Sequence, residues 1–575
     1  MDVQKNWTGT LEEYYQLILN GEIIPKSPHE RIYEALLYAI DSKQFNEELV
    51  GMSEVTQQLI NQYFLPASRG YDLHKRMLIL IGPPGSGKST FVRLLKRALE
   101  KYSRTDEGAV FRIQNCPLNE NPLLALPYKE RKQLFKLRQI KIEGFLSPLN
   151  HFRLMHEFNN NWREIPVERF FISEAKRTGI GTFFPTDPMA QDISDLIGSV
   201  DFSKVTTYGS PSDPRAYRYD GEIQASNQGI LELHEVFKNE PRILYPFLTL
   251  AEEKMYKISR QAMIYSNQVI IGHSNEDELK SFIESKNKAL LTRMSIFRFP
   301  YNLKLNDEVQ IYKNKFSKEN QDRFTGLALE TLAVVAILSR LKRTKQQLTL
   351  QEKMDIYNSD NLQQKRVLQQ EFIDEGMTGI DPRLSFQVIA NTLSKTDQFI
   401  NETDLLNELS DLIKKDYRLT EYEKKQYKYV LTLAENYYYK RLEKMIKEKY
   451  VEKFKDKINE YVQKYLQQYH SNTPLVKDVH QLIDIDSTNL AEYQEALKKL
   501  LSGEEEIFRE HYPANFIEAF VKIAISNELN KFNTERQIES WIKKFIDDEQ
   551  VKRWFKSEKN MIDKLKKVLE QMIKI

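Results

Sequence analysis

Cysteine is almost absent from this chain, because only Cys116 occurs among its 575 residues. A single cysteine excludes an intrachain disulfide and any zinc module that is built from several cysteines. We expect Cys116 to be a small buried side chain and not a catalytic nucleophile. Apolar residues make up 41% of the chain, which is enough to build hydrophobic cores, and the length predicts about three or four domains.

Long hydrophobic runs are missing as well. No segment of about 18 consecutive apolar residues occurs, so the sequence predicts no membrane-spanning helix. Residues 1–6 do not show the charged and then apolar pattern of a secretory signal. We therefore expect a cytoplasmic protein that has no membrane partner.

A large excess of charge of one sign is the third absence. The chain contains 84 Lys and Arg against 82 Asp and Glu, which gives a net charge of +2. This balance provides no general attraction to nucleic acid. One aromatic and basic cluster, residues 437–441, suits stacking on bases, but its helical surroundings favour a solvated helix that packs on a neighbour. We expect nucleic acid not to be a partner.

A phosphate-binding motif is the strongest signal that is present. Residues 82–89 read GPPGSGKS, follow the apolar run 77–81, and match the pattern G-x-x-x-x-G-K-[ST]. Glycines let successive backbone N–H groups converge on phosphate oxygens. Apolar residues at helical spacing over 90–102 predict a helix whose positive N-terminal end faces the anion. The sequence therefore predicts that the chain binds a nucleoside triphosphate.

Each residue of this loop has an expected contact with the nucleotide. Lys88 is placed to reach the β- and γ-phosphates, and the hydroxyl of Ser89 is placed to ligate Mg²⁺. The expected nucleotide-binding residues of the loop are Gly82, Pro83, Pro84, Gly85, Ser86, Gly87, Lys88, Ser89 and Thr90.

A second apolar run, residues 230–233, leads to the acidic residue Glu235. A strand of this kind normally lies beside the phosphate-loop strand, so we expect Glu235 to orient the attacking water. His234 occupies the position where an aspartate usually contacts Mg²⁺. Glu232 points to the opposite face from Glu235 if the strand is regular, so the Mg²⁺ relies on Ser89 and ordered waters.

Two further polar residues accompany later strands. Asn275 follows the apolar run 268–272 and is a candidate sensor of the γ-phosphate. Arg293 precedes a predicted strand at 295–299, from where an arginine reaches the γ-phosphate of a neighbouring subunit. A surface salt bridge is the alternative role for Arg293.

Alternation of strands and helices up to residue 302 predicts an α/β fold, a parallel sheet with helices on both faces. A run at 169–172 is expected to contribute a strand, as are 230–233 and 268–272. Residues 1–45 show two helical apolar stripes, and the chain beyond residue 303 is almost wholly helical. Three- and four-residue apolar spacing predicts an amphipathic helix over 430–466.

These parts in this order resemble the AAA+ ATPases. Residues 187–201 are similar to the segment before the second acidic motif in the magnesium-chelatase-like branch. The resemblance narrows to the PrkA family, bacterial proteins described as serine protein kinases with an AAA+ core, and it is dense over residues 1–400. It is carried by residues 7–11 with Tyr14, 116–117 with 120–123, 179–183, 212–217 with 220–222, and 293–294 with 300–303.

The resemblance implies roles and domain boundaries. It implies that residues 82–89 bind ATP, that Asn275 is the first sensor, and that Arg293 is a trans finger in a ring of identical subunits. Arg383, within residues 375–383, is implied as the second sensor on the same nucleotide. The implied domains are an N-terminal helical segment 1–45, an AAA+ P-loop ATPase core 46–302, a helical lid 303–400 and an all-α C-terminal domain 401–575.

The use of the ATP has three candidate interpretations. The resemblance implies a serine protein kinase in bacterial stress or sporulation control, although the common kinase motifs are missing at 179–184 and 201–203. Such a kinase would have to pass the phosphoryl group from the P-loop site to a hydroxyl. The alternative is an oligomeric motor that remodels a client protein or feeds Lon-like proteolysis, with residues 182–185 as a pore loop or as core. The third is a regulator that binds ATP without turnover.

Overall fold

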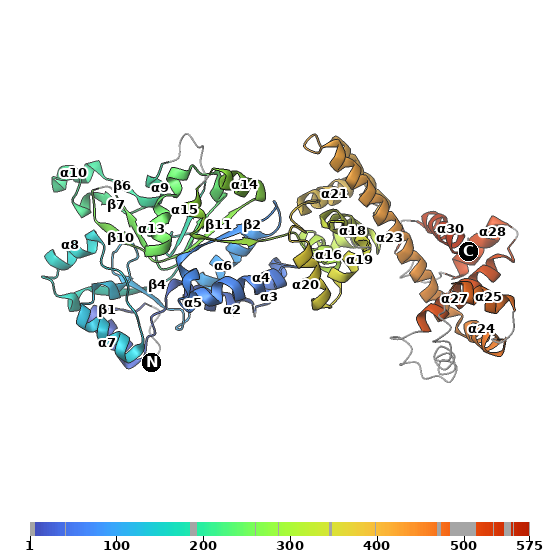
Figure 1. The fold of residues 1–575 in the computed structure, drawn as a ribbon, viewed down its shortest axis with the longest axis horizontal. Helices are drawn as coiled ribbons and strands as arrows, with labels where there is room; N and C mark the ends of the chain where they lie inside the picture. Colours follow the sequence, from blue (N-terminus) through green and yellow to red (C-terminus); the bar gives the residue numbers. More distant parts are fainter. Residues whose placement is uncertain are drawn as a thin grey trace. The chain divides into compact units, whose positions relative to one another are not determined.

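A computed structural model describes residues 6–40, 42–184, 192–258, 260–285, 287–343, 348–396, 398–468, 473–482, 513–532, 534–545, 554–555 and 557–573 (Figure 1). The chain divides into two compact units. The first consists of Met1–Glu308, Arg340–Thr349 and Asp355–Asp381, and the second of Val309–Ser339, Leu350–Met354 and Pro382–Ile575. Within the described residues, no helix combines the length and the apolar character needed to cross a bilayer.

A five-stranded parallel sheet forms the centre of the first unit. Its strand order is β12-β2-β11-β8-β5, and all neighbouring pairs are parallel. The strands are β2 (Met77–Ile81), β5 (Ile180–Phe183), β8 (Ile230–Leu233), β11 (Val269–Ser274) and β12 (Met294–Arg298). Every residue of β2, β8 and β11 is buried, as expected for a parallel sheet that is covered on both faces. The predicted α/β fold is confirmed.

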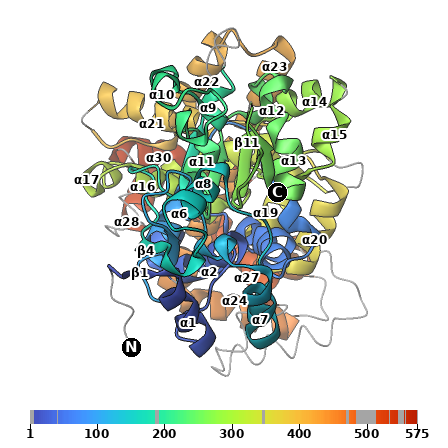
Figure 2. The same cartoon turned by 90° about the vertical axis from the view of Figure 1, so that its left-hand side faces the viewer.

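Alternate residues of β2 enter two different hydrophobic cores. Leu78 and Leu80 pack with α2 (Pro28–Ile40) and α6 (Lys88–Tyr102). Met77, Ile79 and Ile81 belong to the other core, which includes side chains of α13 (Pro246–Glu253) and α14 (Glu276–Glu284). Figures 1 and 2 show these helices around the sheet. The two-residue period of a strand thus distributes one apolar run between two helical layers.

The first unit also contains smaller elements. Its other principal helices are α1 (Leu11–Asn20), α3 (Lys43–Glu48), α4 (Ser53–Leu59), α7 (Tyr128–Arg138), α8 (Pro148–His156), α10 (Phe202–Tyr208), α11 (Glu222–Ser226), α15 (Lys288–Leu291) and α20 (Leu362–Glu371). Two short antiparallel ribbons join β6 (Ser199–Val200) to β7 (Tyr217–Arg218) and β9 (Met255–Lys257) to β10 (Met263–Tyr265). The stripes predicted within residues 1–45 correspond to α1 and α2.

One predicted strand of the central sheet lies elsewhere. The run at 169–172 falls partly in β4 (Pro166–Phe170), which pairs antiparallel with β1 (Thr8–Thr10) and β3 (Val110–Ile113). Buried and half-exposed residues alternate at the start of β4, and Glu168 pairs with Arg112 on β3 at 2.7 Å. Such alternation suits an antiparallel sheet with one wetter face, not a fully buried parallel strand.

The strand next to β8 at one edge of the parallel sheet is β5, and not the run at 169–172. Thr182 and Phe183, which were predicted to begin a pore loop, are residues of this strand, and Phe183 is buried. Phe184 follows the strand and is 57% exposed. Pro185 lies outside the described residues. Two of the four residues predicted as a pore loop are therefore part of the sheet. For these two residues, the alternative that they belong to the core holds.

The described regular elements of the second unit are helices. Its helices are most of α16 (Leu305–Lys315) and α18 (Ala328–Arg340), then α17 (Lys318–Gln321), α21 (Pro382–Lys395), α22 (Glu402–Lys415), α23 (Glu421–Lys453), α24 (Lys455–Gln468), α25 (Pro474–Leu482), α27 (Pro513–Leu529), α28 (Glu535–Phe545) and α30 (Glu558–Ile573), while α19 (Leu350–Asn358) is shared between the units. Side chains of α23, α24, α25, α27, α28 and α30 form a hydrophobic core of their own. The predicted helical C-terminal region is confirmed.

The predicted helix over 430–466 is two helices, so that prediction was wrong in its continuity. Phe454 separates α23 from α24 with φ −125° and ψ 34°, and its ring packs 4.8 Å from the ring of Tyr450. The interruption lets α24 pack against α27. A tertiary contact therefore outweighs the continuous helical pattern of the sequence.

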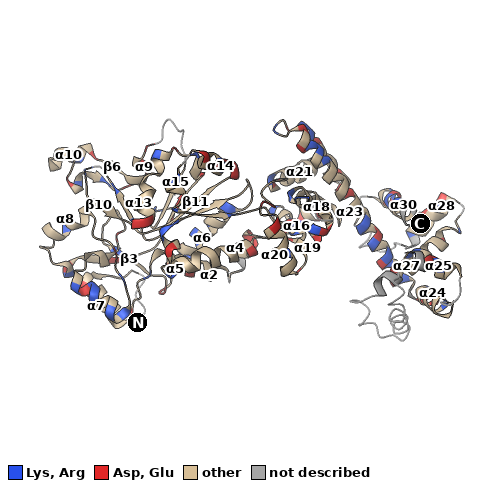
Figure 3. Ribbon diagram, in the orientation of Figure 1, with Lys and Arg blue, Asp and Glu red and all other residues tan. Residues whose placement is uncertain are grey.

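The tyrosine cluster on α23 packs within the second unit. Tyr438 is buried in the helical core, and the Tyr437 hydroxyl donates a hydrogen bond to Glu330 at 2.8 Å. Lys567 lies over the ring of Tyr439 at 4.2 Å. Lys, Arg, Asp and Glu are interspersed along α23 in Figure 3. These contacts agree with the interpretation of a solvated helix packed on neighbours.

Candidate active site

The phosphate-loop motif forms a loop between β2 and α6, as predicted from its sequence. Gly85 and Gly87 have φ of +77° and +97°, which is the left-handed region that glycine adopts without strain. A Cβ on Gly82 would collide with the carbonyl oxygen of Phe299, so this position also requires glycine. The Gly82 N–H donates to the Ser274 carbonyl at the end of β11, at 3.2 Å.

The side chains of the loop suit a polyphosphate and its cation. Lys88 is the first residue of α6, and its Nζ donates to the carbonyl oxygens of Gly82 at 2.6 Å and Pro83 at 2.8 Å. Ser89 follows it and is exposed. A glycine cradle at the N-terminus of a 15-residue helix fits the phosphates of ATP. The contacts of Lys88 with the β- and γ-phosphates and of Ser89 with Mg²⁺ stay predictions. Mg·ATP held here would supply the phosphoryl group and the charge of the metal.

The carboxyl ends of three strands meet beside this loop. Ser274 of β11 is the register partner of Ile81 at the end of β2, and Gly272 of β11 is the partner of Leu233 at the end of β8. Neighbouring strands lie about 4.8 Å apart. Asn275 and Glu235 follow these strand ends. They therefore lie, like the phosphate loop, at the carboxyl ends of the parallel strands.

Glu235 occupies a turn directly after β8. Its φ is +43°, and its carboxylate lies 3.5 Å from Lys238 Nζ, which also pairs with Glu278 at 3.2 Å. The Glu235 side chain is 39% exposed, so its carboxylate is accessible to water. Burial by itself raises the pKa of Glu278. Hydrogen bonds with Ser274, Glu235 and Lys238 and the charge of Lys238 outweigh burial and lower this pKa.

Asn275 is the N-cap residue of α14. Its amide oxygen accepts a hydrogen bond from the Glu278 N–H at 2.8 Å. The cap uses the amide oxygen, whereas a phosphate would require the amide N–H groups. The cap thus holds the side chain near the strand end, and its role as a sensor stays a prediction.

Arg293 lies at the amino ends of the strands, whereas the phosphate loop of its own chain lies at their carboxyl ends. It precedes β12, and the Met77 N–H at the start of β2 donates to its carbonyl at 2.9 Å. The five residues of β2 span about 16 Å at 3.3 Å per residue. Arg293 is therefore about one strand length away from the phosphate loop of its own chain.

The guanidinium of Arg293 has partners within its own chain. It forms an ion pair with Glu252 at 2.7 Å and donates to the carbonyl oxygens of Leu248 at 2.8 Å and Ala289 at 3.0 Å. Its side chain is 30% exposed. The salt-bridge alternative thus describes the isolated chain, and the function in trans stays a prediction.

Arg383, the predicted second sensor, lies in the first turn of α21 in the second unit. Its contact with nucleotide stays a prediction. Asp381, two residues earlier, belongs to the first unit, and a Cβ on Gly85 would collide with its carboxylate. The Tyr301 hydroxyl donates to the Pro84 carbonyl at 2.8 Å. The phosphate loop is thus covered by side chains that the motif did not indicate.

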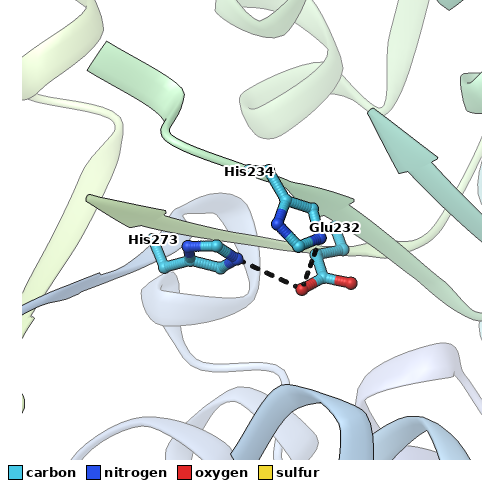
Figure 4. A group of neighbouring side chains, drawn as sticks. All are labelled: Glu232, His234 and His273. Carbon is cyan, nitrogen blue, oxygen red and sulfur yellow. Dashed lines mark hydrogen bonds and ion pairs between the residues drawn. The ribbon is translucent and has the colours of Figure 1, made fainter. Parts of the chain in front are cut away.

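A buried polar cluster beside the loop was also missed by sequence reasoning. Glu232 of β8 accepts hydrogen bonds from His234 at 3.1 Å and His273 at 3.2 Å, and it forms an ion pair with Lys96 of α6 (Figure 4). Glu232 lies in β8 and His234 directly follows this strand, and the two side chains share a face because they are two residues apart in extended backbone. Lys96 lies eight residues after Lys88 on the same helix, which is the only sequence signal for this contact.

The electrostatics of this cluster favour the charged carboxylate. Burial by itself raises the pKa of Glu232. The two imidazole hydrogen bonds and the charge of Lys96 outweigh burial and hold this pKa below its usual range. Lys96 also pairs with Glu174 at 2.5 Å and donates to Thr182 Oγ1 at 3.0 Å. The cluster therefore connects the phosphate-loop helix to three strands of the sheet.

The fold and the site define a P-loop nucleotide-binding protein. Residues 4–347 match the family described as PrkA AAA domain, and residues 351–574 match the family described as PrkA serine protein kinase C-terminal domain. The chain belongs to the PrkA family, and its P-loop core is an AAA domain. The resemblance inferred from the sequence is confirmed.

Two relatives carry different names. A Bacillus subtilis (strain 168) protein named ATP-dependent protease PrkA is 38% identical over 464 residues, which cover 77% of this chain and 73% of the relative. An Escherichia coli (strain K12) protein named serine/threonine kinase YeaG is 31% identical over 370 residues, which cover 60% of this chain and 56% of the relative. The chain thus aligns with little more than half of the second relative.

Proposed function

We propose that this chain is an ATP-dependent enzyme that binds Mg·ATP at residues 82–89 and cleaves the bond to the γ-phosphate in order to act on another protein. One observation carries this proposal: the phosphate loop, Glu235 and Asn275 all follow the carboxyl ends of neighbouring parallel strands. A nucleotide-binding protein without turnover would not need an accessible carboxylate beside the γ-phosphate position.

The residues have complementary parts in the reaction. Lys88 neutralises charge that develops on the γ-phosphate, and the amides of the loop hold the β-phosphate. Glu235 accepts a hydrogen bond from the attacking water and orients it in line with the leaving oxygen. Asn275 donates to a γ-phosphate oxygen and reports whether it is present. Ser89, phosphate oxygens and water suit the Mg²⁺, since the imidazole of His234 is a poorer ligand for this ion than a carboxylate.

The subunits act as a homo-oligomeric ring in this proposal. Arg293 lies at the amino ends of the strands, away from the phosphate loop of its own chain, and in this proposal it contacts the nucleotide of another subunit. Because a trans arginine is worth about 10³–10⁵ in rate in other P-loop enzymes, assembly would control turnover. The work of the ring would be to remodel a client protein.

Transfer of the γ-phosphate to a protein serine is the second candidate. It is supported by the family description of the C-terminal region and by the name of the E. coli relative. The name of the B. subtilis relative supports a link to proteolysis. The regular elements described beyond residue 401 are all helices, which argues against an α/β protease domain there. The part in stress or sporulation control rests on family membership alone.

Labelled ATP distinguishes these activities. We expect the purified chain to release labelled phosphate into solution, with a rate per subunit that rises with protein concentration. Label on the serines of an added protein, such as casein, would identify the kinase instead. Lys88→Ala should abolish either product, whereas Lys101→Ala, an exposed lysine of the same helix, should retain it. ATP binding without either product would contradict the proposed function.

A further inference from the structure

The cluster of Glu232, His234 and His273 has the composition of a metal site. The donor atoms of the three side chains all lie within 4.8 Å of one another, and both imidazoles direct Nε2 at the same oxygen, Oε1 of Glu232 (Figure 4). We propose that these three residues bind a divalent cation of the kind that imidazole prefers, such as Zn²⁺, distinct from the Mg²⁺ of the nucleotide.

The donor types select the class of ion. Two imidazole nitrogens and one carboxylate oxygen are a common ligand set for Zn²⁺, with a fourth position left for water. Mg²⁺ prefers oxygen ligands and keeps most of its waters, so it is disfavoured here. Ser89, on the phosphate loop, remains the ligand suited to the nucleotide's own Mg²⁺.

The distances fit such an ion after a small adjustment. Ligand atoms about 2.0–2.1 Å from a tetrahedral ion lie about 3.3 Å from one another. The two distances from imidazole nitrogen to Glu232 Oε1 are 3.1 Å and 3.2 Å. The imidazoles of His234 and His273 need to approach by at most about 1.5 Å to complete the triangle. His234 is the more exposed of the two, so it has fewer packed neighbours to displace than His273.

Neighbouring side chains orient the three donors. Lys96 pairs with the second oxygen of Glu232, so Oε1 is left to face the imidazoles. The ring of Phe184 stacks on His234 with centroids 4.0 Å apart and planes 19° apart. The ion pair and the ring stack restrict the orientation of Glu232 and His234, as outer contacts do around metal sites.

The charge of the cluster also favours a cation. Glu232 and Glu174 bring two negative charges to Lys96, which supplies one positive charge. These three side chains together leave one surplus negative charge, shared by the buried carboxylate of Glu232 and the carboxylate of Glu174. A divalent ion would neutralise this surplus and join β8, which leads to Glu235, to β11, which leads to Asn275.

Cobalt provides a direct test that needs no nucleotide. The full chain is stripped with EDTA, dialysed, and titrated with Co²⁺ in the absence of ATP. We expect one Co²⁺ per chain with the visible absorption bands of a four-coordinate ion that has nitrogen ligands, and one equivalent of Zn²⁺ should abolish them. Failure of ATP turnover would leave this result unaffected, so the two proposals fail separately.

Variants connect the signal to the cluster. We expect His234→Asn and His273→Asn each to lower Co²⁺ affinity by at least about 100-fold, the upper range for loss of an outer contact. His151→Asn removes an exposed histidine on α8 and should leave affinity unchanged. Circular dichroism verifies that the variants are folded. The absence of cobalt bands in the wild-type chain, or equal affinity in His234→Asn, would overturn the metal site.

Discussion

Glu235 combines an accessible carboxylate with an unusual backbone. Its left-handed φ places the side chain beyond the end of β8, beside Lys238 and not inside the sheet. Neither the exposure nor the contact is visible in the sequence, where the acidic residue is recognised only by its position after an apolar run. A substitution that changes only the carboxylate of Glu235 therefore tests the proposed chemistry.

We expect Glu235→Gln to lower kcat for ATP cleavage by about 10²–10⁴, because an amide keeps the shape but accepts a proton poorly. The Kd for ATP should change by less than about twofold, since the phosphate contacts come from the loop. Steady-state turnover and calorimetry measure the two quantities. Glu284→Gln, an exposed change near the end of α14, is the matched control. Unchanged turnover in Glu235→Gln would remove this residue from the reaction.

Cys116 is a small buried side chain, as expected for the single cysteine of the chain. Its side chain is buried, and the Asn150 amide lies 3.0 Å from its sulfur. Burial, with a smaller contribution from the negative charge of Glu120, raises the pKa of Cys116 to about 11. The thiol is thus protonated at neutral pH, which excludes the reactive thiolate that a nucleophile requires.

At the scale of elements, the unit of β2, phosphate loop and α6 was predicted most accurately. The predicted strand at 77–81 corresponds to β2, and the predicted helix at 90–102 corresponds to α6 without its first two residues. Local pattern was sufficient there because the motif, the apolar run and the helical spacing are continuous in the chain. The strand at 169–172 failed because pairing with β1 and β3 is a property of distant segments.

The close approach of Phe299 to the loop gives a prediction for this unit. Gly82→Ala should displace the loop, because the added Cβ would meet the Phe299 carbonyl, and should lower ATP affinity at least about tenfold. We expect a loss of stability of about 1–3 kcal/mol, as for other overpacked sites. Calorimetry with ATP and urea unfolding measure the two effects.

Gly70→Ala is the control for this change. Gly70 has φ of +75° and open space around its Cα, so alanine there introduces backbone strain of about 1–3 kcal/mol without a collision. It should reduce stability to a similar degree and leave ATP affinity unchanged. Equal loss of affinity in both variants would mean that general destabilisation, not the shape of the loop, controls binding.

At the scale of the whole molecule, the position of Arg293 requires a second subunit if the residue is catalytic. We expect Arg293→Ala to reduce ATP cleavage by about 10³-fold or more and to leave ATP binding intact. Mixing this variant with inactive Lys88→Ala should restore part of the activity, because each subunit supplies what the other lacks. Turnover of the mixture, compared with each variant alone, measures this effect.

Glu252→Gln separates this function from a structural salt bridge. The variant breaks the ion pair of Arg293 but keeps the guanidinium. If Arg293 acts on a neighbour's nucleotide, Glu252→Gln should retain turnover. If the ion pair is what matters, both variants should lose stability and activity together, and the mixture should stay inactive.

The sequence by itself determined the phosphate loop, the α/β character of the core and the helical nature of the remainder, because these follow from continuous local patterns. Only the tertiary structure decided which strand ends lie together and that Arg293 lies at the other end of the strands from its own phosphate loop. The same holds for the cluster of Lys96, Glu232, His234 and His273. Strand order and contacts between distant side chains depend on packing over the whole unit. No local pattern specifies which distant segment a given strand or side chain will meet.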